Sequence, residues 1–181
     1  MDNLNYLIYF CEQFYSSHYL PIAIFYNNKS NIHSFCPIKN WGDFIRQNIN
    51  LDSPFYPYIY NSQKYGIFGL IKVCDYYLVI GPARAQKKSD NSIKIIAREL
   101  NLSNEEFIQL KEFFYALPNY TYNHFFNLLS FLEFSLNKNK IDIKNYYLLN
   151  QNFSKFVEYN KVNNHIKDNN NYHGTYYFEK I

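Results

Sequence analysis

Several residue types and patterns that mark particular classes of protein are scarce or absent in this sequence. Its three cysteines are few and scattered, as is typical of reduced cytosolic thiols rather than of a disulfide framework. Its five glycines form no phosphate-binding loop, and it has neither a nucleophile elbow nor an HExxH motif. We therefore expect no enzyme, no cofactor and no bound metal.

Long apolar runs are also missing. No stretch approaches the roughly 18 apolar residues that a membrane-spanning helix needs, and the opening MDNLNYLIYF has no basic leader. These absences predict a cytoplasmic protein with no membrane partner.

Basic residues are few and do not cluster. The net charge is +3, only Arg46, Arg84 and Arg98 are arginines, and the longest basic run, Lys87–Lys88, lies beside Asp90. A nucleic-acid-binding domain normally gathers basic side chains on one face. We therefore expect this chain itself not to bind DNA.

Apolar and aromatic residues are plentiful, at 48% and 21% of the sequence. A chain of 181 residues can bury roughly 70% of the surface that its unfolded form exposes. The composition predicts one domain with a large core, over residues 1–150. The Asn-rich segment 151–181 is interpreted as a connector that ends in the first turn of a helix, after which a longer protein is expected to continue.

The opening residues predict a helix that begins after Asp2 and is apolar most of the way round. Its apolar positions recur at helical spacing, and Tyr6, Tyr9 and Phe10 lie on other faces. Such a helix is either shared with a second subunit or buried between a sheet and later helices. The three aromatic residues are therefore candidates for a homodimer interface.

Two hairpins are predicted, over residues 21–36 and 65–82, with a short helix around Trp41 and a further strand between them. Pro57 in that strand cannot donate to a ladder on both sides, which predicts an edge position. In the second hairpin both alternating sets of residues are apolar, for example Ile71 and Leu78 against Leu70 and Val79. The centre of the sheet is therefore expected to be covered on both faces.

These elements predict an α+β fold with a five-stranded antiparallel sheet. If the first and last strands pair in the middle, the spatial order is 2-1-5-4-3, the order found in PAS and GAF sensor domains. Three further helices are expected after Arg84. The first is capped by Ser89 or Asp90, and the second opens with a capping box formed by Ser103 and Glu106.

Four segments carry a resemblance to a known family: FCEQFYSSHYLPIAIFYNN, YGIFGLIKVCDYYLVIGPAR, LPNYTYNHFFNLLSFLEFSLN and YHGTYYFEKI. Together they resemble the amino-terminal half of AraC-type transcriptional regulators from low-GC Gram-positive bacteria. His173, Thr175, Tyr176 and Glu179 fit the segment that opens the linker in that family. The resemblance implies a sensor or dimerisation domain whose DNA-binding helix-turn-helix units follow Ile181.

A ligand pocket is predicted between the sheet and the short helix, where such sites are mainly apolar with a few polar groups. Its candidate residues are Trp41, Phe44, Tyr58, Tyr60, Phe68 and Tyr77. The same residues would equally form a solid aromatic core, and the sequence leaves both alternatives open. The predicted function is a regulatory domain that responds to a small-molecule effector, with a ligand-free dimerisation or protein-interaction module as the alternative.

Overall fold

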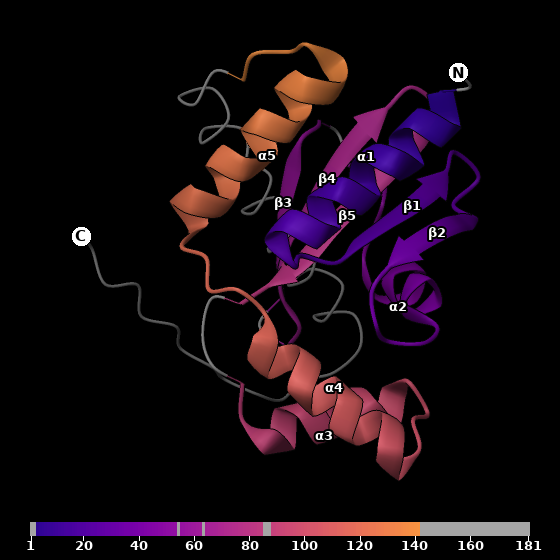
Figure 1. Ribbon diagram of the computed structural model, residues 1–181, viewed down its shortest axis with the longest axis vertical. Coiled ribbons are helices and arrows are strands. Elements are labelled where there is room, and N and C mark those ends of the chain that lie inside the picture. Colours follow the sequence, from indigo (N-terminus) through magenta and orange to yellow (C-terminus); the bar gives the residue numbers. More distant parts are fainter. Residues whose placement is uncertain (1–2, 54, 63, 85–87, 142–181) are drawn as a thin grey trace, which may run out of the picture. The chain divides into compact units, whose positions relative to one another are not determined.

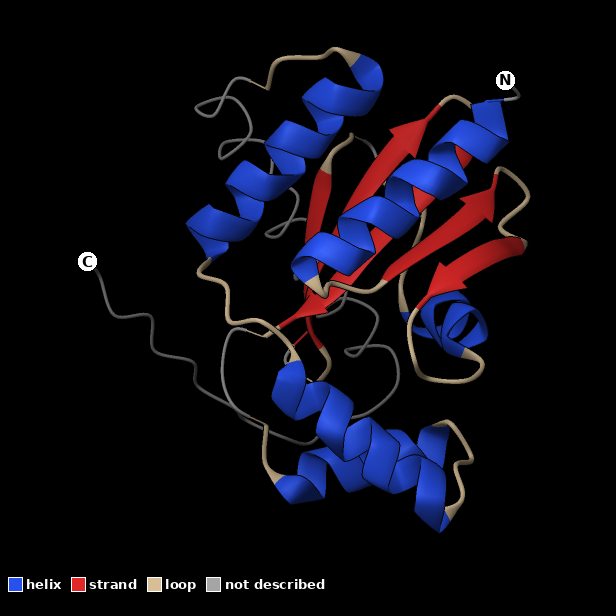
Figure 2. Cartoon of the chain, in the orientation of Figure 1, coloured by secondary structure: helices blue, strands red, loops and turns tan. Residues whose placement is uncertain are grey.

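The computed structural model of the chain describes residues 3–53, 55–62, 64–84 and 88–141, which form five helices and five strands (Figures 1 and 2). In chain order they are α1 (Asn3–His18), β1 (Ile22–Tyr26), β2 (Asn31–Phe35), α2 (Trp41–Asn48), β3 (Tyr58–Ser62), β4 (Gly66–Val73), β5 (Tyr76–Ala83), α3 (Asp90–Glu99), α4 (Asn104–Ala116) and α5 (Tyr122–Asn137). The predicted connector, 151–181, and the predicted cap Asp2 lie outside the described residues.

The five strands form one antiparallel sheet in the order β2-β1-β5-β4-β3, which confirms the predicted topology. The first and last strands pair in the middle, where Ile22 lies opposite Ile80 and Ile24 opposite Leu78. β3 occupies an edge, as Pro57 required, and the strand begins one residue after that proline.

Helices cover both faces of the sheet, as the apolar residues of the second hairpin predicted. Ile71 and Leu78 are buried on the face crossed by α1 and α5 (Figure 1). Leu70 and Val79 are buried on the opposite face, in a core that includes side chains of α2, α3 and α4. Both sides of the β4–β5 hairpin are therefore packed.

Helix α1 has one buried stripe and one exposed face. Leu7, Cys11 and Phe14 are buried, and the helix contacts β1 and β2. Tyr6 and Tyr9 remain exposed. The arrangement follows from a helical spacing of three and four residues between the apolar positions that face the sheet.

Side-chain caps begin the three helices that follow the sheet. The hydroxyls of Ser89, Ser103 and Thr121 each accept a hydrogen bond from a backbone N–H in the first turn of α3, α4 and α5. The Ser103–Glu106 capping box is complete, as predicted, and Ser89 rather than Asp90 caps α3. Within the described ranges, every helix is too short or too polar to cross a membrane.

Candidate functional site

The six aromatic residues predicted to form a pocket come together on one side of the sheet. Four of them are buried in a single core cluster, and Tyr58 and Tyr60 are half-buried against it. Tyr58 lies opposite Leu70, and Tyr60 lies opposite Phe68, on paired strands. The strand register and α2 thus bring all six to the same layer.

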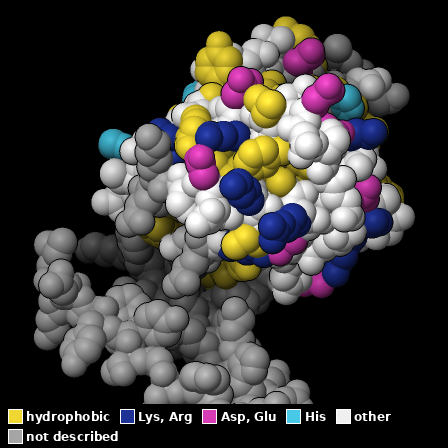
Figure 3. All heavy atoms as spheres, turned by 90° about the horizontal axis from the view of Figure 1, so that it is seen from below, with side chains coloured by type: hydrophobic (Ala, Val, Ile, Leu, Met, Phe, Trp, Pro, Cys, Tyr) yellow, Lys and Arg dark blue, Asp and Glu magenta, His cyan; other side chains and the backbone are white. Residues whose placement is uncertain are grey.

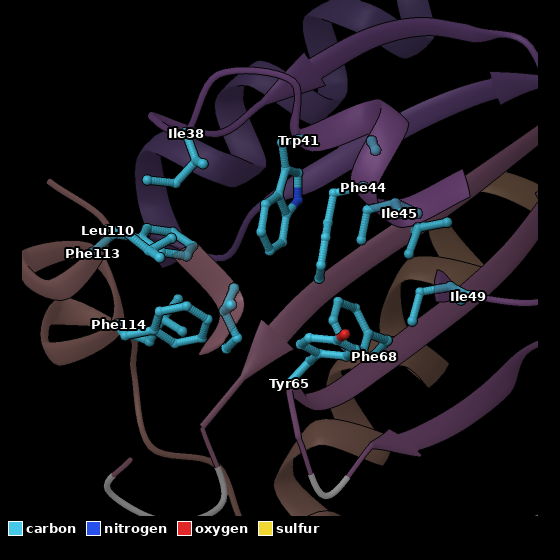
Figure 4. Packing of buried hydrophobic residues seen from close by; sticks show 14 of the residues in the cluster. Ile38, Trp41, Phe44, Ile45, Ile49, Tyr65, Phe68, Leu110, Phe113 and Phe114 are labelled. Atoms are coloured by element: carbon cyan, nitrogen blue, oxygen red, sulfur yellow. The ribbon is translucent and has the colours of Figure 1, made fainter. Parts of the chain in front are cut away.

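Trp41 and Phe44 form the helix side of this layer. Their rings stack with centroids 4.9 Å apart, and Phe113 of α4 meets Trp41 edge-on at 5.8 Å (Figure 4). Trp41 is 1% exposed, but its indole N–H has no hydrogen-bond partner among the described residues. A buried N–H without a partner is costly, so an acceptor placed beside Trp41 would be favourable.

Tyrosines add polar groups to this aromatic layer. Tyr77 is buried, and its hydroxyl donates to the side-chain oxygen of Asn27 at 3.1 Å. Burial raises the pKa of Tyr58.

Tyr65 belongs to the same cluster and was not among the predicted site residues. Its ring meets Phe44 edge-on at 4.8 Å (Figure 4). Its hydroxyl donates to Glu99 Oε2 at 2.7 Å and to Asn48 Oδ1 at 3.1 Å. It thus joins the start of β4 to both α2 and α3. In the sequence, Tyr65 is simply the first residue of the predicted hairpin 65–82.

A cavity of about 350 Å³ lies elsewhere, where the end of α1 and the segment after β2 meet α4. Phe113 and Leu117 are its buried side chains, and most of the others at its border are exposed. The cavity is lined by Tyr15, Tyr19, Pro37, Gln109, Glu112, Phe113, Ala116 and Leu117. None of the six predicted pocket residues is among them.

Sequence reasoning missed this cavity because its walls are far apart along the chain. Phe113 carried a usable signal, since it follows Leu110 at helical spacing and so belongs to the buried stripe of α4. Tyr15 and Glu112 carried none, because only tertiary packing brings them to one place.

The predicted dimer residues lie on α1. Tyr6 and Tyr9 are 52% and 58% exposed, while Phe10 is half-buried, with its ring centroid 6.4 Å from that of Tyr6. In the described part of the chain, α1 is therefore not enclosed between the sheet and the later helices. Its outward face is available to another molecule.

The end of the molecule that bears α3 and α4 carries basic, acidic and hydrophobic side chains together (Figure 3). One of its ion pairs joins Lys111 Nζ to Asp90 Oδ2 at 2.7 Å. Among the described residues, no group of three or more His, Cys, Asp or Glu side chains is placed to hold a metal ion.

The sequence matches no protein-family model, and no curated protein matches it at a significant level.

Proposed function

We propose that this chain is the regulatory domain of an AraC-type transcription regulator and that it senses a signal, forms a homodimer, or does both. The observation that carries the proposal is the five-stranded antiparallel sheet in the order shared by PAS and GAF sensors, with helices on both faces. The four sequence segments that resemble the regulator family support it independently.

In this proposal an effector acts by favouring one arrangement of the helices around the sheet. Coupling between two sites of about 1–3 kcal/mol is typical of such regulation. The helices in question are α1, which exposes aromatic side chains, and α3 to α5, which lead toward the end of the chain. DNA is contacted only through the separate half that the resemblance implies. The chain itself is not an enzyme, and it acts in the cytoplasm.

Sensing is tested by thermal denaturation of the chain with candidate small-molecule metabolites. A ligand that binds only the folded state at about 100 times its Kd adds about 2.7 kcal/mol to the free energy of unfolding. A metabolite that raises the melting temperature in proportion to the logarithm of its concentration would support an effector site. A chain that none of a broad set stabilises would rule out sensing by the isolated domain.

The exposed aromatic face of α1 favours a second candidate, a dimerisation module that binds no ligand. Tyr6 and Tyr9 lie one turn apart on this face, and Glu12 is the only Asp, Glu, Lys or Arg in α1. Two copies of such a face meet with little charge repulsion, and tyrosine is enriched in protein interfaces. A second copy of this chain is therefore the partner that we propose for it.

Sedimentation equilibrium tests this second candidate with a matched pair of double variants. Tyr6→Ser/Tyr9→Ser removes the exposed rings of α1, and Ile95→Ser/Ile108→Ser removes two exposed apolar side chains of α3 and α4. We expect the first pair to convert a dimer to a monomer and the second pair to leave the mass unchanged. A dimer that survives the α1 substitutions would place its interface elsewhere.

A further inference from the structure

The cavity beside α4 has an apolar floor and a polar rim. Phe113 and Leu117 are buried at its base, whereas Tyr19, Gln109 and Glu112 are exposed at its border. Its volume of about 350 Å³ lies at the small end of the range for ligand sites. These dimensions suit a compact organic molecule.

The polar side chains at the rim do not contribute hydrogen bonds or ion pairs to the described part of the fold. Within the described residues, the side chains of Tyr15, Tyr19, Gln109 and Glu112 take part in no hydrogen bond or ion pair. The Tyr15 ring is held in place by Phe35, with centroids 6.4 Å apart. The exposed polar groups around the opening are therefore free to bind a guest in place of water.

The charge of the lining is negative. Glu112 is its only ionised residue type, and no Lys, Arg or His borders the cavity. Lys111, which precedes Glu112 in α4, pairs with Asp90 instead. A positively charged guest would meet one carboxylate and no competing lysine of the lining.

We propose that this cavity binds a small organic ammonium cation with an apolar or aromatic body. The ammonium group pairs with Glu112 and lies near the Tyr15 and Tyr19 rings, which attract cations through their electron-rich faces. The apolar body packs on Phe113 and Leu117. The proposal that the cavity binds a cation does not depend on the proposed regulatory function. The proposal that the cavity is the effector site does depend on it.

An occupant of the cavity would contact two parts of the fold. Tyr15 and Tyr19 come from the last turn of α1 and the residue after it, on the helix that exposes Tyr6 and Tyr9. Phe113 lines the cavity and also packs edge-on against Trp41 at 5.8 Å. An occupant thus contacts the candidate dimer helix and the aromatic core together.

The test uses the 181-residue chain with two probes of similar shape, 2-phenylethylammonium and its neutral analogue 2-phenylethanol. Binding is measured by isothermal titration, and backbone amide NMR shifts locate the site. We expect the cation to bind more tightly than the alcohol and to shift the amides of residues that line the cavity. Equal affinity for both probes would overturn the proposal, and so would NMR shifts centred elsewhere. The absence of binding up to about 10 mM, which corresponds to a binding free energy weaker than about 2.7 kcal/mol, would also overturn it.

Two exposed carboxylates of α4 give a matched pair of variants. Glu112→Gln is expected to weaken binding of the cation by about twofold to fivefold while leaving the alcohol unaffected. Glu105→Gln, on the same helix but outside the lining, is expected to bind both probes as the unchanged protein does. Undiminished cation binding by a folded Glu112→Gln variant would contradict the site.

Tyr19→Asn supplies a second test, because it removes an aromatic ring and leaves the charge of the cavity lining unchanged. Tyr19 has a backbone φ of 54°, a conformation that Asn adopts readily, so this variant is expected to fold. It should lower the affinity for the cation more than that for the alcohol, and an equal loss for both would contradict the cation–π contact. Cation binding that leaves the oligomeric state of the chain unchanged in sedimentation equilibrium would overturn the effector role and leave the binding site intact.

Discussion

Gly69 of β4 lies directly against Leu129 of α5. A Cβ atom built on Gly69 would come within 2.3 Å of Leu129 Cδ2 and 2.9 Å of its Cγ. Leu129 is fully buried, so its side chain cannot turn into solvent to make room. The absence of a side chain at position 69 is what lets α5 approach the middle of the sheet so closely.

Gly69→Ala is therefore expected to destabilise the fold. Overpacking of a core by one methyl group commonly lowers the free energy of unfolding by about 1–3 kcal/mol. Urea denaturation of the variant would measure this loss. Leu129→Ala alone should cost about 2–5 kcal/mol because it leaves a cavity. In the double variant the new methyl group occupies that space, so its total cost should fall below the sum of the two single costs. If the two losses of unfolding free energy simply add in the double variant, the two residues are not energetically coupled, which would contradict the close contact.

The topology of the sheet could be predicted because separate sequence features agreed. Pro57 required an edge, and the two apolar faces of the hairpin that contains Ile71 and Leu78 required a central position. The aromatic layer around Trp41 could be predicted as a group for the same reason, since strand alternation and helical spacing fix which side each residue faces. Whether that layer is hollow could not be predicted, because aromatic side chains fill a core and line a pocket with the same pattern.

Trp41 and Phe68 provide a test of the packed layer. Both are almost fully buried, and Phe68→Ala is expected to cost about 3–5 kcal/mol of unfolding free energy. Trp41 is the only tryptophan of the chain, so its fluorescence reports on this layer alone. In the unchanged protein we expect blue-shifted emission with little quenching by acrylamide. Emission like that of a solvated indole would contradict burial.

Cys11 and Cys74 are expected to differ sharply in reactivity. Cys11 is fully buried, and burial raises its pKa to about 12, whereas Cys74 is exposed in the β4–β5 turn. Only the thiolate reacts rapidly with alkylating reagents. Mass spectrometry after brief treatment with iodoacetamide at neutral pH should find Cys74 labelled and Cys11 unlabelled until denaturant is added. Early labelling of Cys11 would mean that α1 leaves the sheet readily.

The capping box of α4 predicts a dependence of stability on pH. The backbone N–H of Ser103 donates to the Glu106 carboxylate at 2.8 Å and holds the pKa of that carboxyl below its ordinary value. This contribution to stability is present above the ordinary carboxyl pKa and is lost as the pH falls through the lower pKa of the folded state. Glu106→Gln keeps a hydrogen-bonding side chain but has no charge to titrate.

The measurement compares melting temperatures of the unchanged chain and Glu106→Gln at about pH 7 and about pH 3. The unchanged chain should be the more stable of the two at the higher pH, and the difference should shrink at the lower pH. Glu105→Gln serves as the control, because the Glu105 carboxylate is not part of the capping box. A difference that stays constant with pH would contradict the assigned hydrogen bond.

A role as a regulatory domain is tested most directly by the melting temperature of this chain, measured as a function of protein concentration and of added metabolites. Dimerisation and effector binding both stabilise the folded state by mass action. The proposal predicts a melting temperature that rises between about 1 µM and about 100 µM protein, or that rises with at least one metabolite. A melting temperature that stays constant across all of these conditions would contradict both sensing and dimerisation.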